Sequence, residues 1–268
     1  MNQEDLVSVI MPTYNAGKYL AGSINSILNQ SYKNLELLIT DDASTDPTTL
    51  QLLQEFASKD NRVDILYLKE NHGAGYARNQ SIERAKGRYI AFCDSDDRWT
   101  TDKLEKQIAF MNKKKCALSC ASYIIFDGET QNEIGFCTAP KKITYGMMKR
   151  DNKVGCLTAI YDVQMLGRKF FMPTIRKRQD WALFLQIIRE CKVCYAYPDK
   201  PLAYYCIRRN SISSNKMSLM KYNIAVYKEI LGFHPIKANL YFFTLFLPTY
   251  GAKILKRKFD SYTFTHQK

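Results

Sequence analysis

The regular alternation of short apolar runs with amphipathic segments over the first hundred residues most constrains the fold. The apolar runs are rich in β-branched and aliphatic residues, as buried strands are. The segments between them carry apolar residues at helical spacing, and the links are short. This pattern predicts an α/β fold with a doubly wound, mostly parallel sheet. We expect strands at residues 6–11, 35–40, 63–68 and 89–93, and helices at residues 17–30, at 48–59 and in a segment that ends at Ala85.

The same alternation continues beyond Asp102. We expect a helix at residues 103–114, a strand at 117–126 and a later helix that begins near Asp180, with a less regular stretch at 127–153. Beyond residue 201 the pattern indicates a loop, a polar helix and an apolar segment. We therefore divide the chain into a domain at residues 1–215 and a basic, apolar C-terminal helical extension at residues 216–268.

Polar residues follow three of the predicted strands. Residues 13–15 (TYN) follow the first strand, Asp41 and Asp42 end the second, and residues 94–97 (DSDD) follow the fourth. In an open parallel sheet, ligands bind beyond the carboxyl ends of the strands. These three segments therefore predict a binding site at one edge of the sheet.

The carboxylate cluster at residues 94–97 predicts a metal. Like charges repel and each resists desolvation, whereas Mn²⁺ or Mg²⁺ commonly joins one or two carboxylates to substrate phosphates. In an extended D-x-D segment the first and third side chains project to the same face, so Asp94 and Asp96 can share one site while Asp97 turns away or lies at the turn into the next helix. The alternative is a strand-end turn that caps the following helix.

Several segments together resemble family-two inverting glycosyltransferases of the GT-A fold, of the bacterial surface-polysaccharide type. The resemblance covers residues 6–215 and rests on VSVIMPTYN, DDASTD, GAGYARN, DSDD and RQDW, which follow one another in that order. It implies that a hexose passes from a UDP-sugar to a hydroxyl of a glycan or lipid-linked acceptor, with Mn²⁺ or Mg²⁺ as cofactor. It also implies a nucleotide-sugar-binding half at residues 1–100 and an acceptor half at residues 101–215.

The resemblance implies roles for single residues. Pro12, Thr13 and Tyr14 stand where the family contacts the base and ribose, and the ring of Tyr14 is suited to stacking on uracil. Asp42 matches the carboxylate that accepts a hydrogen bond from the uracil ring, while we expect Asp41 to be structural. We assign metal coordination to Asp96 and Asp97, and donor binding to Pro12, Thr13, Tyr14, Asn15, Asp42, Arg78, Asp94, Ser95 and Arg208.

Asp180 is the residue that the resemblance implies as general base. The family places an acidic residue at the start of a helix after the D-x-D cluster, and Gln179-Asp180-Trp181 fits that pattern. A base must lie opposite the departing diphosphate, within hydrogen-bonding distance of the acceptor hydroxyl. The alternative is that Asp180 caps this helix, and the two roles are compatible. Trp181 either stacks on a sugar or packs in the core.

Residues 205–213 depart from the pattern Y-R-x-H-x-x-S-x-S that many relatives carry at this place. Cys206 replaces the Arg, and Arg208 stands in the position of the His. A metal-binding His is therefore not available there. Arg208, Arg209 or Lys216 remains as a candidate to neutralise phosphate.

Three other classes of function share single features with this sequence. Residues 73–77 (GAGYA) imitate the dinucleotide-binding fingerprint, but that motif belongs to the first strand–helix turn, which carries Pro-Thr-Tyr-Asn here. A nucleotidyltransferase would show a glycine-rich phosphate loop with an activating Lys at the same turn. A non-catalytic nucleotide-sugar-binding or scaffold protein of the same fold is the remaining alternative, and the intact Asp96 and Asp180 argue against it.

The formal net charge of +13 is concentrated at the C-terminal end. Residues 201–268 contain eleven Lys and Arg against two acidic residues, and no nucleic-acid-binding motif accompanies them. Residues 240–252 carry no charge, are shorter than the roughly twenty residues that span a bilayer, and are interrupted by Pro248. We expect either a helix packed on the core or an interfacial segment. In the second case Lys253, Lys256, Arg257 and Lys258 lie over an anionic membrane surface.

The N-terminal residues and the cysteines together predict a cellular location. The N-terminus is acidic before it is apolar, which is unlike a signal peptide, and the eight Cys lack zinc-ligand spacing. We expect reduced, structural cysteines. The protein is therefore predicted to be cytoplasmic, with peripheral association at the inner face of the cell membrane.

Overall fold

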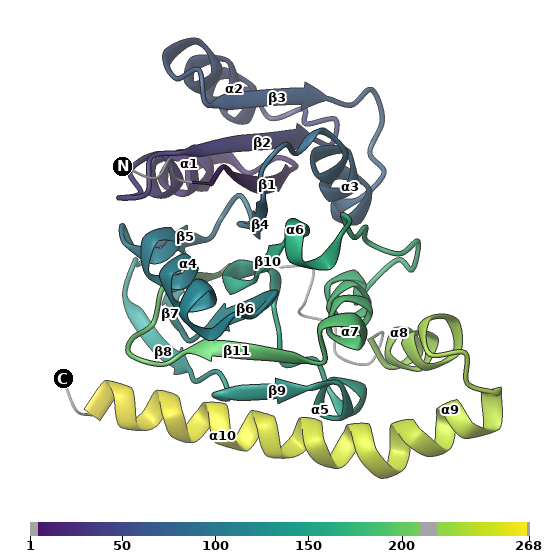
Figure 1. Ribbon diagram of the computed structural model, residues 1–268. Helices are drawn as coiled ribbons and strands as arrows, with labels where there is room; N and C mark the ends of the chain where they lie inside the picture. The colour runs from purple at the N-terminus through teal and green to yellow at the C-terminus, as the bar shows by residue number, and fades with distance from the viewer. Residues whose placement is uncertain (1–4, 209–218, 267–268) are drawn as a thin grey trace.

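The four predicted N-terminal strands pair in parallel within one mixed sheet. The computed structural model describes residues 5–208 and 219–266. The strands of the large sheet are β1 (Val7–Thr13), β2 (Leu35–Asp41), β3 (Val63–Tyr67), β4 (Tyr89–Phe92), β6 (Leu118–Ala121), β9 (Lys142–Thr144), β10 (Ile160–Asp162) and β11 (Val193–Tyr197). Their order is β3-β2-β1-β4-β10-β6-β11-β9 (Figure 1), with β10 antiparallel to both neighbours and β9 antiparallel to β11. The predicted α/β fold with a mostly parallel sheet is confirmed.

Helices bury both faces of this sheet. Alternate residues of a strand point to opposite faces, and in β1 Val9 and Met11 join one hydrophobic core while Ile10 joins the other. The core that contains Val9 is covered by α1 (Leu20–Leu28), α2 (Pro47–Lys59) and α4 (Lys103–Lys114). The core that contains Ile10 is covered by α3 (Ala74–Arg84) and α7 (Gln179–Cys191). The sheet is therefore doubly wound.

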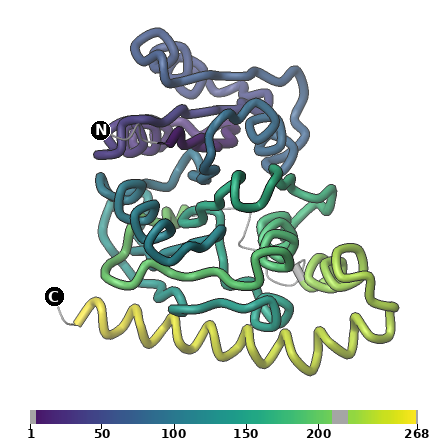
Figure 2. The backbone as a smooth tube through the Cα atoms, in the orientation of Figure 1, coloured from purple at the N-terminus to yellow at the C-terminus, as the bar shows by residue number. Residues whose placement is uncertain are grey.

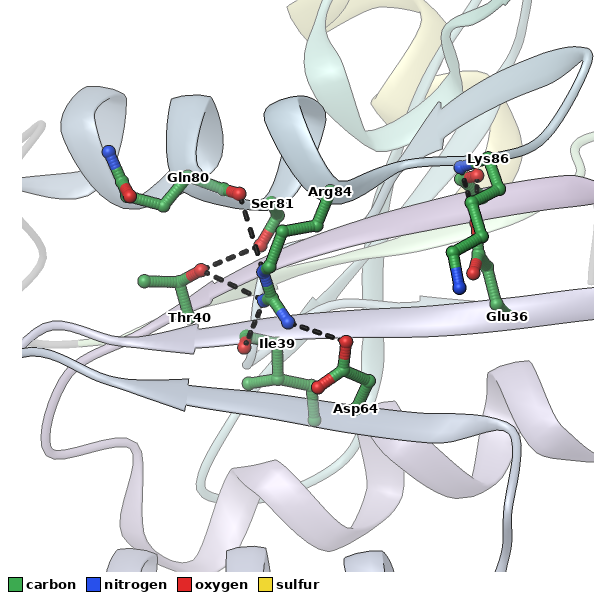
Figure 3. A network of polar contacts seen from close by, with 9 residues as sticks. Glu36, Ile39, Thr40, Asp64, Gln80, Ser81, Arg84 and Lys86 are labelled. Atoms are coloured by element: carbon green, nitrogen blue, oxygen red, sulfur yellow. Dashed lines mark hydrogen bonds and ion pairs between the residues drawn. The ribbon is translucent and has the colours of Figure 1, made fainter.

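Polar contacts at the C-terminal end of α3 fix this helix on β2 and β3 (Figure 3). The guanidinium of Arg84 donates to Asp64 at 2.7 Å and to the carbonyl oxygen of Ile39 at 3.1 Å. The hydroxyls of Thr40 and Ser81 lie 2.7 Å apart. Because the helix is held at this end, its other end is set at the carboxyl edge of the sheet.

The strand predicted at residues 117–126 is wrong, because the chain changes sheets at Ser122. The carbonyl oxygen of Ser122 accepts from the backbone N–H of Leu202, and its hydroxyl accepts from Ala139 N–H. β6 ends before this residue, and the next strand starts a second sheet with the order β5-β12-β7-β8. Its strands are β5 (Arg98–Trp99), β7 (Tyr123–Asp127), β8 (Glu133–Cys137) and β12 (Ala203–Ile207). The apolar run does not reveal the change because both strands are buried.

The C-terminal segment is one continuous rod of helix, seen as the long yellow-green coil in Figure 2. It consists of α9 (Pro235–Tyr241), a π-helical turn (Phe242–Phe246) and α10 (Leu247–His266). The prediction that Pro248 interrupts this segment is wrong. A proline clashes with the carbonyl four residues earlier in a regular helix, and the wider π turn before Pro248 relieves that clash. Within residues 5–208 and 219–266, no helix is long and apolar enough to cross a bilayer.

The remaining elements are short. They are α5 (Tyr145–Arg150), α6 (Val163–Leu166), α8 (Leu219–Ala225), a π-helical turn (Val226–Ile230) and two 3₁₀ turns (Gly17–Tyr19 and Cys156–Thr158). All eight cysteines are free thiols, in agreement with the predicted reduced state.

Lys103, in the first turn of α4, is fully buried. Its ammonium lies 4.1 Å from the ring centroid of Trp99, and no hydrogen-bond acceptor reaches it in the described part of the chain. The ring favours the charged form, but burial outweighs it and lowers the pKa of Lys103 to about 7.

We predict that Lys103→Met removes a pH dependence of stability. With a folded pKa of about 7, below that of the unfolded chain, the unfolded state binds more protons above pH 7, so stability rises with pH. Titration of Lys103 alone contributes about 2 kcal/mol of stability between pH 7 and pH 9, so the stability of the wild type relative to the variant should rise by about that amount over this range. Urea unfolding at several pH values measures it. The exposed Lys113→Met on the same helix is the control, and an unchanged slope in Lys103→Met would contradict the assignment.

Candidate active site

The carboxyl ends of β1, β2 and β4 meet at one edge of the large sheet. Thr13 at the end of β1 pairs with Asp41 at the end of β2, and the N–H of Asp42 donates to the carbonyl of Thr13 at 2.8 Å. On the other side of β1, Cys93 N–H donates to the carbonyl of Ile10 at 3.1 Å. The three polar segments predicted to converge therefore do lie side by side.

The four residues at the end of the first strand, Pro12 to Asn15, divide into exposed and structural ones. The ring of Tyr14 is half exposed, and the buried Thr13 hydroxyl has no hydrogen-bond partner among the described residues. Asn15 adopts a φ of +44°, and its side-chain oxygen accepts from Thr45 and Asp46 N–H at 2.8 and 2.9 Å. Pro12 is buried inside β1. The side chain of Asn15 therefore shapes the turn at residues 44–46, while Tyr14 is open to a ligand.

Asp42 holds the turn that begins α3. Its two carboxylate oxygens accept from the N–H groups of His72 and Gly73 at 2.8 and 2.7 Å. Gly73 has a φ of +89°, a conformation that favours glycine. Each carboxylate oxygen can accept a second hydrogen bond. The neighbouring Asp41 is structural, as predicted, because both of its oxygens accept from Ser44.

Arg78 and Asp94 form an ion pair in which the arginine is largely buried and the carboxylate is partly exposed. The Arg78 guanidinium donates to Asp94 at 2.5 Å, and only 11% of the Arg78 side chain is exposed. Burial alone would lower the pKa of Arg78, but Asp94, Cys156 and Asp180 together outweigh it and raise the pKa. Arg78 comes from α3 and Asp94 from the end of β4, so the pair ties α3 to the carboxylate cluster.

Asp96 has a second arginine as its partner. Arg208, just after β12, donates to Asp96 at 2.7 Å, and its guanidinium lies 5.3 Å from the ring centroid of Tyr19. Burial raises the pKa of Asp96, the charge of Asp94 adds to this, and Arg208 opposes it. Arg209 and Lys216, the other basic candidates, lie outside the described residues.

The side chain of Asp97 points into the protein, away from the side on which Asp94 and Asp96 are open to solvent. It is 2% exposed, and its carboxylate accepts from Cys206 N–H at 2.8 Å. Burial raises its pKa well above the ordinary value, with further contributions from Asp96 and Asp94. Asp97 therefore has the structural task of fixing β12 beside the cluster. Its N–H donates to the carbonyl oxygen of Asp94 at 3.1 Å, so residues 94–97 form a strand-end turn and not the expected extended D-x-D segment. Ser95 is buried.

Asp180 is the second residue of α7. Arg178 and not Asp180 precedes the helix, so the capping alternative is wrong. The side-chain amide of Asn152 donates to the Asp180 carboxylate at 2.8 Å. Trp181 is fully buried and donates to the carbonyl of Met148 at 2.7 Å, which makes it a core residue.

The thiol of Cys156 lies among these charged side chains. Burial raises the pKa of Cys156, Arg78 lowers it, and the charges of Asp180 and Asp94 raise it further. Arg78 in turn has its pKa raised by Asp180 as well as by Asp94. Asp180, Arg78 and Asp94 are therefore all near enough to Cys156 to shift its pKa.

A close approach of two helices also joins the halves of this site. A Cβ added to Gly75 near the start of α3 would lie 2.2 Å from the side-chain amide nitrogen of Gln179. Gln179 directly precedes Asp180, so the absence of a side chain at residue 75 lets α7 bring its carboxylate to the donor side.

The donor set fits a divalent cation that is shared with a substrate. Asp94 and Asp96 offer hard carboxylate oxygens, and the charge of Asp94 adds to the effect of burial in raising the pKa of Asp96. No cluster of three or more His, Cys, Asp or Glu ligands occurs in residues 5–208 and 219–266. Two carboxylates with substrate phosphates are a usual Mg²⁺ arrangement, so the set suits a cation bound together with a diphosphate.

Sequence reasoning missed Asn152 and the pair Tyr19–Glu129. Asn152 is far from Asp180 in the chain. The hydroxyl of Tyr19, whose ring contacts Arg208, donates to Glu129, which lies 110 positions away in the chain. No motif surrounds these residues, and only the folded chain brings them to the site.

Comparison with known proteins identifies the family. The family profile described as Glycosyl transferase family 2 matches residues 8–171, more than half of the chain. The chain belongs to glycosyl transferase family 2. This glycosyltransferase is 42% identical to the putative teichuronic acid biosynthesis glycosyltransferase TuaG of Bacillus subtilis (strain 168). The alignment spans 238 residues, which are 89% of the chain and 93% of TuaG.

A second relative and a solved structure agree with this assignment. WfgD of Escherichia coli, named a UDP-Glc:alpha-D-GlcNAc-diphosphoundecaprenol beta-1,3-glucosyltransferase, is 38% identical over 216 residues, covering 81% of the chain and 83% of WfgD. The crystal structure of S. aureus TarS 1-349 with UDP-GlcNAc matches with a TM-score of 0.69 and 22% identity, over 88% of this chain and 70% of that one. The predicted family and the GT-A fold are confirmed.

We predict that Asp96→Asn and Asp97→Asn differ in metal binding. Asp96→Asn removes a ligand charge and weakens Mn²⁺ binding in the presence of UDP by about tenfold or more, whereas Asp97→Asn keeps the acceptor for Cys206 N–H and changes it less than about threefold. Calorimetric titration with Mn²⁺ and UDP measures both. An equal loss in the two variants would instead support the assignment of Asp96 and Asp97 as the ligand pair.

Proposed function

We propose that this glycosyltransferase moves a hexose from a UDP-sugar to a hydroxyl of a lipid-linked glycan, in the synthesis of a bacterial surface polysaccharide. The observation that carries the proposal is the convergence of Asp180 with Arg78 and Asp94 around Cys156. The names of two relatives support the substrate class, since WfgD takes UDP-Glc and a diphosphoundecaprenol acceptor and TuaG is assigned to teichuronic acid synthesis.

We propose the following division of the chain. Residues 1–100 bind the nucleotide-sugar, residues 101–215 bind the acceptor, and residues 216–268 form the helical extension. The exposed ring of Tyr14 stacks on uracil, and Asp42 uses its remaining acceptor capacity for the ring N–H of the base. We further propose a cytoplasmic enzyme that associates with the inner face of the cell membrane.

The proposed cofactor is Mn²⁺ or Mg²⁺, held by Asp94 and Asp96. When bound there, such a cation neutralises negative charge on the diphosphate leaving group. The chain's own cations, Arg78 and Arg208, each hold one carboxylate and add positive charge beside the same group. They are fixed before the substrate arrives, so no reorganisation is needed as charge develops.

The proposed reaction is a single displacement that inverts the anomeric carbon. Asp180 takes the proton of the acceptor hydroxyl as that oxygen bonds to the anomeric carbon and the bond to UDP breaks. The amide of Asn152 donates to one Asp180 oxygen at 2.8 Å and so orients the carboxylate. The acceptor therefore enters from the α7 side.

A panel of UDP-sugars tests the activity. We expect Mn²⁺-dependent UDP release from one hexose donor, measured by a coupled UDP assay with and without a diphosphoundecaprenol-linked acceptor. Chelation by EDTA should abolish the release. UDP that binds without turnover of any donor would instead support a non-catalytic nucleotide-sugar-binding protein.

Asp180→Asn separates catalysis from donor binding. The variant keeps the acceptor for the Asn152 amide but cannot take a proton at neutral pH, so kcat should fall by about 100-fold or more. UDP affinity, measured by calorimetry, should stay within about threefold because the arginines are untouched. Glu55→Gln, an exposed carboxylate on α2, is the matched control. Near-full transfer by Asp180→Asn would exclude it as the base.

A further inference from the structure

The helical rod at residues 235–266 has a face that packs on the body of the enzyme. Phe242 and Phe246 are buried, and the Phe246 ring lies 5.5 Å from the ring of Trp181. Near the other end, Phe264 stacks on Phe136 with centroids 5.7 Å apart. The expectation that the apolar segment packs on the core is therefore correct for this inner face.

The opposite face carries an apolar stripe that is open to solvent. Its large side chains are between 39% and 74% exposed, the highest value belonging to Ile236. The rod that carries the stripe runs along the lower edge of the molecule in Figure 1. Its members are Ile236, Leu240, Phe243, Leu247, Leu255, Phe259 and Tyr262.

The π turn keeps this stripe straight. Residues 236, 240 and 243 follow the spacing of one helix face, and so do residues 255, 259 and 262. In a regular helix the second group would be rotated by roughly 100° from the first, since each residue turns the chain by about that angle. The turn at Phe242–Phe246 accommodates about one extra residue and cancels this rotation. Six of the seven side chains therefore share one face, while Leu247, directly after the turn, lies to its side and is the least exposed of them.

Basic residues flank the stripe. Lys256 follows Leu255 and Lys258 precedes Phe259, so the two ammonium groups lie on opposite sides of the apolar line, and both lysines are exposed. Asp260, the one acidic residue of the rod, pairs with Lys256 at 2.8 Å. An apolar line between basic edges suits an anionic bilayer, in which apolar side chains insert and lysines reach the phosphates. A second copy of the rod would instead bring like charges together.

The inner face of the rod connects this surface to the proposed base. Lys253 on α10 donates to the carbonyl of Asn152 and lies 3.2 Å from the carboxylate of Asp151. Asn152 in turn donates to Asp180. A membrane under the rod would therefore lie beside the acceptor side of the site.

We propose that the outer face of residues 235–266 is a docking surface for an anionic lipid bilayer, and that it sets the acceptor side of the site next to the membrane. The second clause rests on the proposed lipid-linked acceptor, whereas the first does not. The structure thus combines the two alternatives for the tail, because the same helix packs on the core with one face and presents the other to lipid.

Vesicle flotation in low salt, without any nucleotide-sugar, tests the surface. We expect the full chain to float with phosphatidylcholine vesicles that contain phosphatidylglycerol, and not with phosphatidylcholine alone. The triple variant Leu240→Ser, Leu255→Ser, Phe259→Ser and the double variant Lys256→Gln, Lys258→Gln should each lose about tenfold or more of the binding. The matched controls are Tyr67→Ser with Met165→Ser, and Lys113→Gln with Lys114→Gln, all exposed positions elsewhere.

Two further measurements distinguish a loss of vesicle binding from a loss of folding and from a loss of the proposed activity. Circular dichroism and Tm should be unchanged in the stripe variant, since the replaced side chains are exposed. Transfer to a water-soluble acceptor should also be unchanged, so a loss of binding is distinguishable from a loss of the proposed activity. The proposal is overturned if the wild type does not bind anionic vesicles, or if the triple and the double variant both bind as well as the controls. It is also overturned if light scattering shows a dimer that the triple variant dissociates.

Discussion

Three carboxylates within four residues stand at the end of β4, and the fold gives each of them a separate partner. Arg78 from α3 meets Asp94, Arg208 from the end of β12 meets Asp96, and the backbone of β12 meets Asp97. Without these partners the like charges would repel across a buried strand end. The two sheets and α3 are thus tied together at the proposed active site.

The base-bearing helix α7 depends on a different kind of contact. Trp181 fills the core, with its ring 5.6 Å from Tyr227 and 5.5 Å from Phe246, and burying such a ring stabilises a fold by about 3 kcal/mol. This apolar anchor fixes the start of the helix while its neighbour Asp180 remains open to the site. The C-terminal rod supplies part of that anchor, so the same helix that supports the base also presents the exposed stripe.

The site could be predicted from the sequence as far as its residues belong to motifs at strand ends. Strand ends converge in any parallel sheet, so the neighbourhood of Asp42 and the cluster at residues 94–97 followed from the pattern of strands alone. The partners did not follow. The hydrogen bond from Asn152 to Asp180 and the buried orientation of Asp97 depend on contacts between residues 28 and 109 positions apart, for which local spacing gives no signal.

By itself the sequence determined the strands and helices of the N-terminal half and the edge of the sheet at which ligands bind, because hydrophobic periodicity and turn residues act locally. Only the tertiary structure decided that residues 117–126 divide between two sheets, and that the C-terminal segment is one rod across Pro248. Both outcomes depend on where buried surface is available: an apolar run looks the same whether it enters one sheet or two, and a π turn is tolerated where Phe242 and Phe246 gain burial.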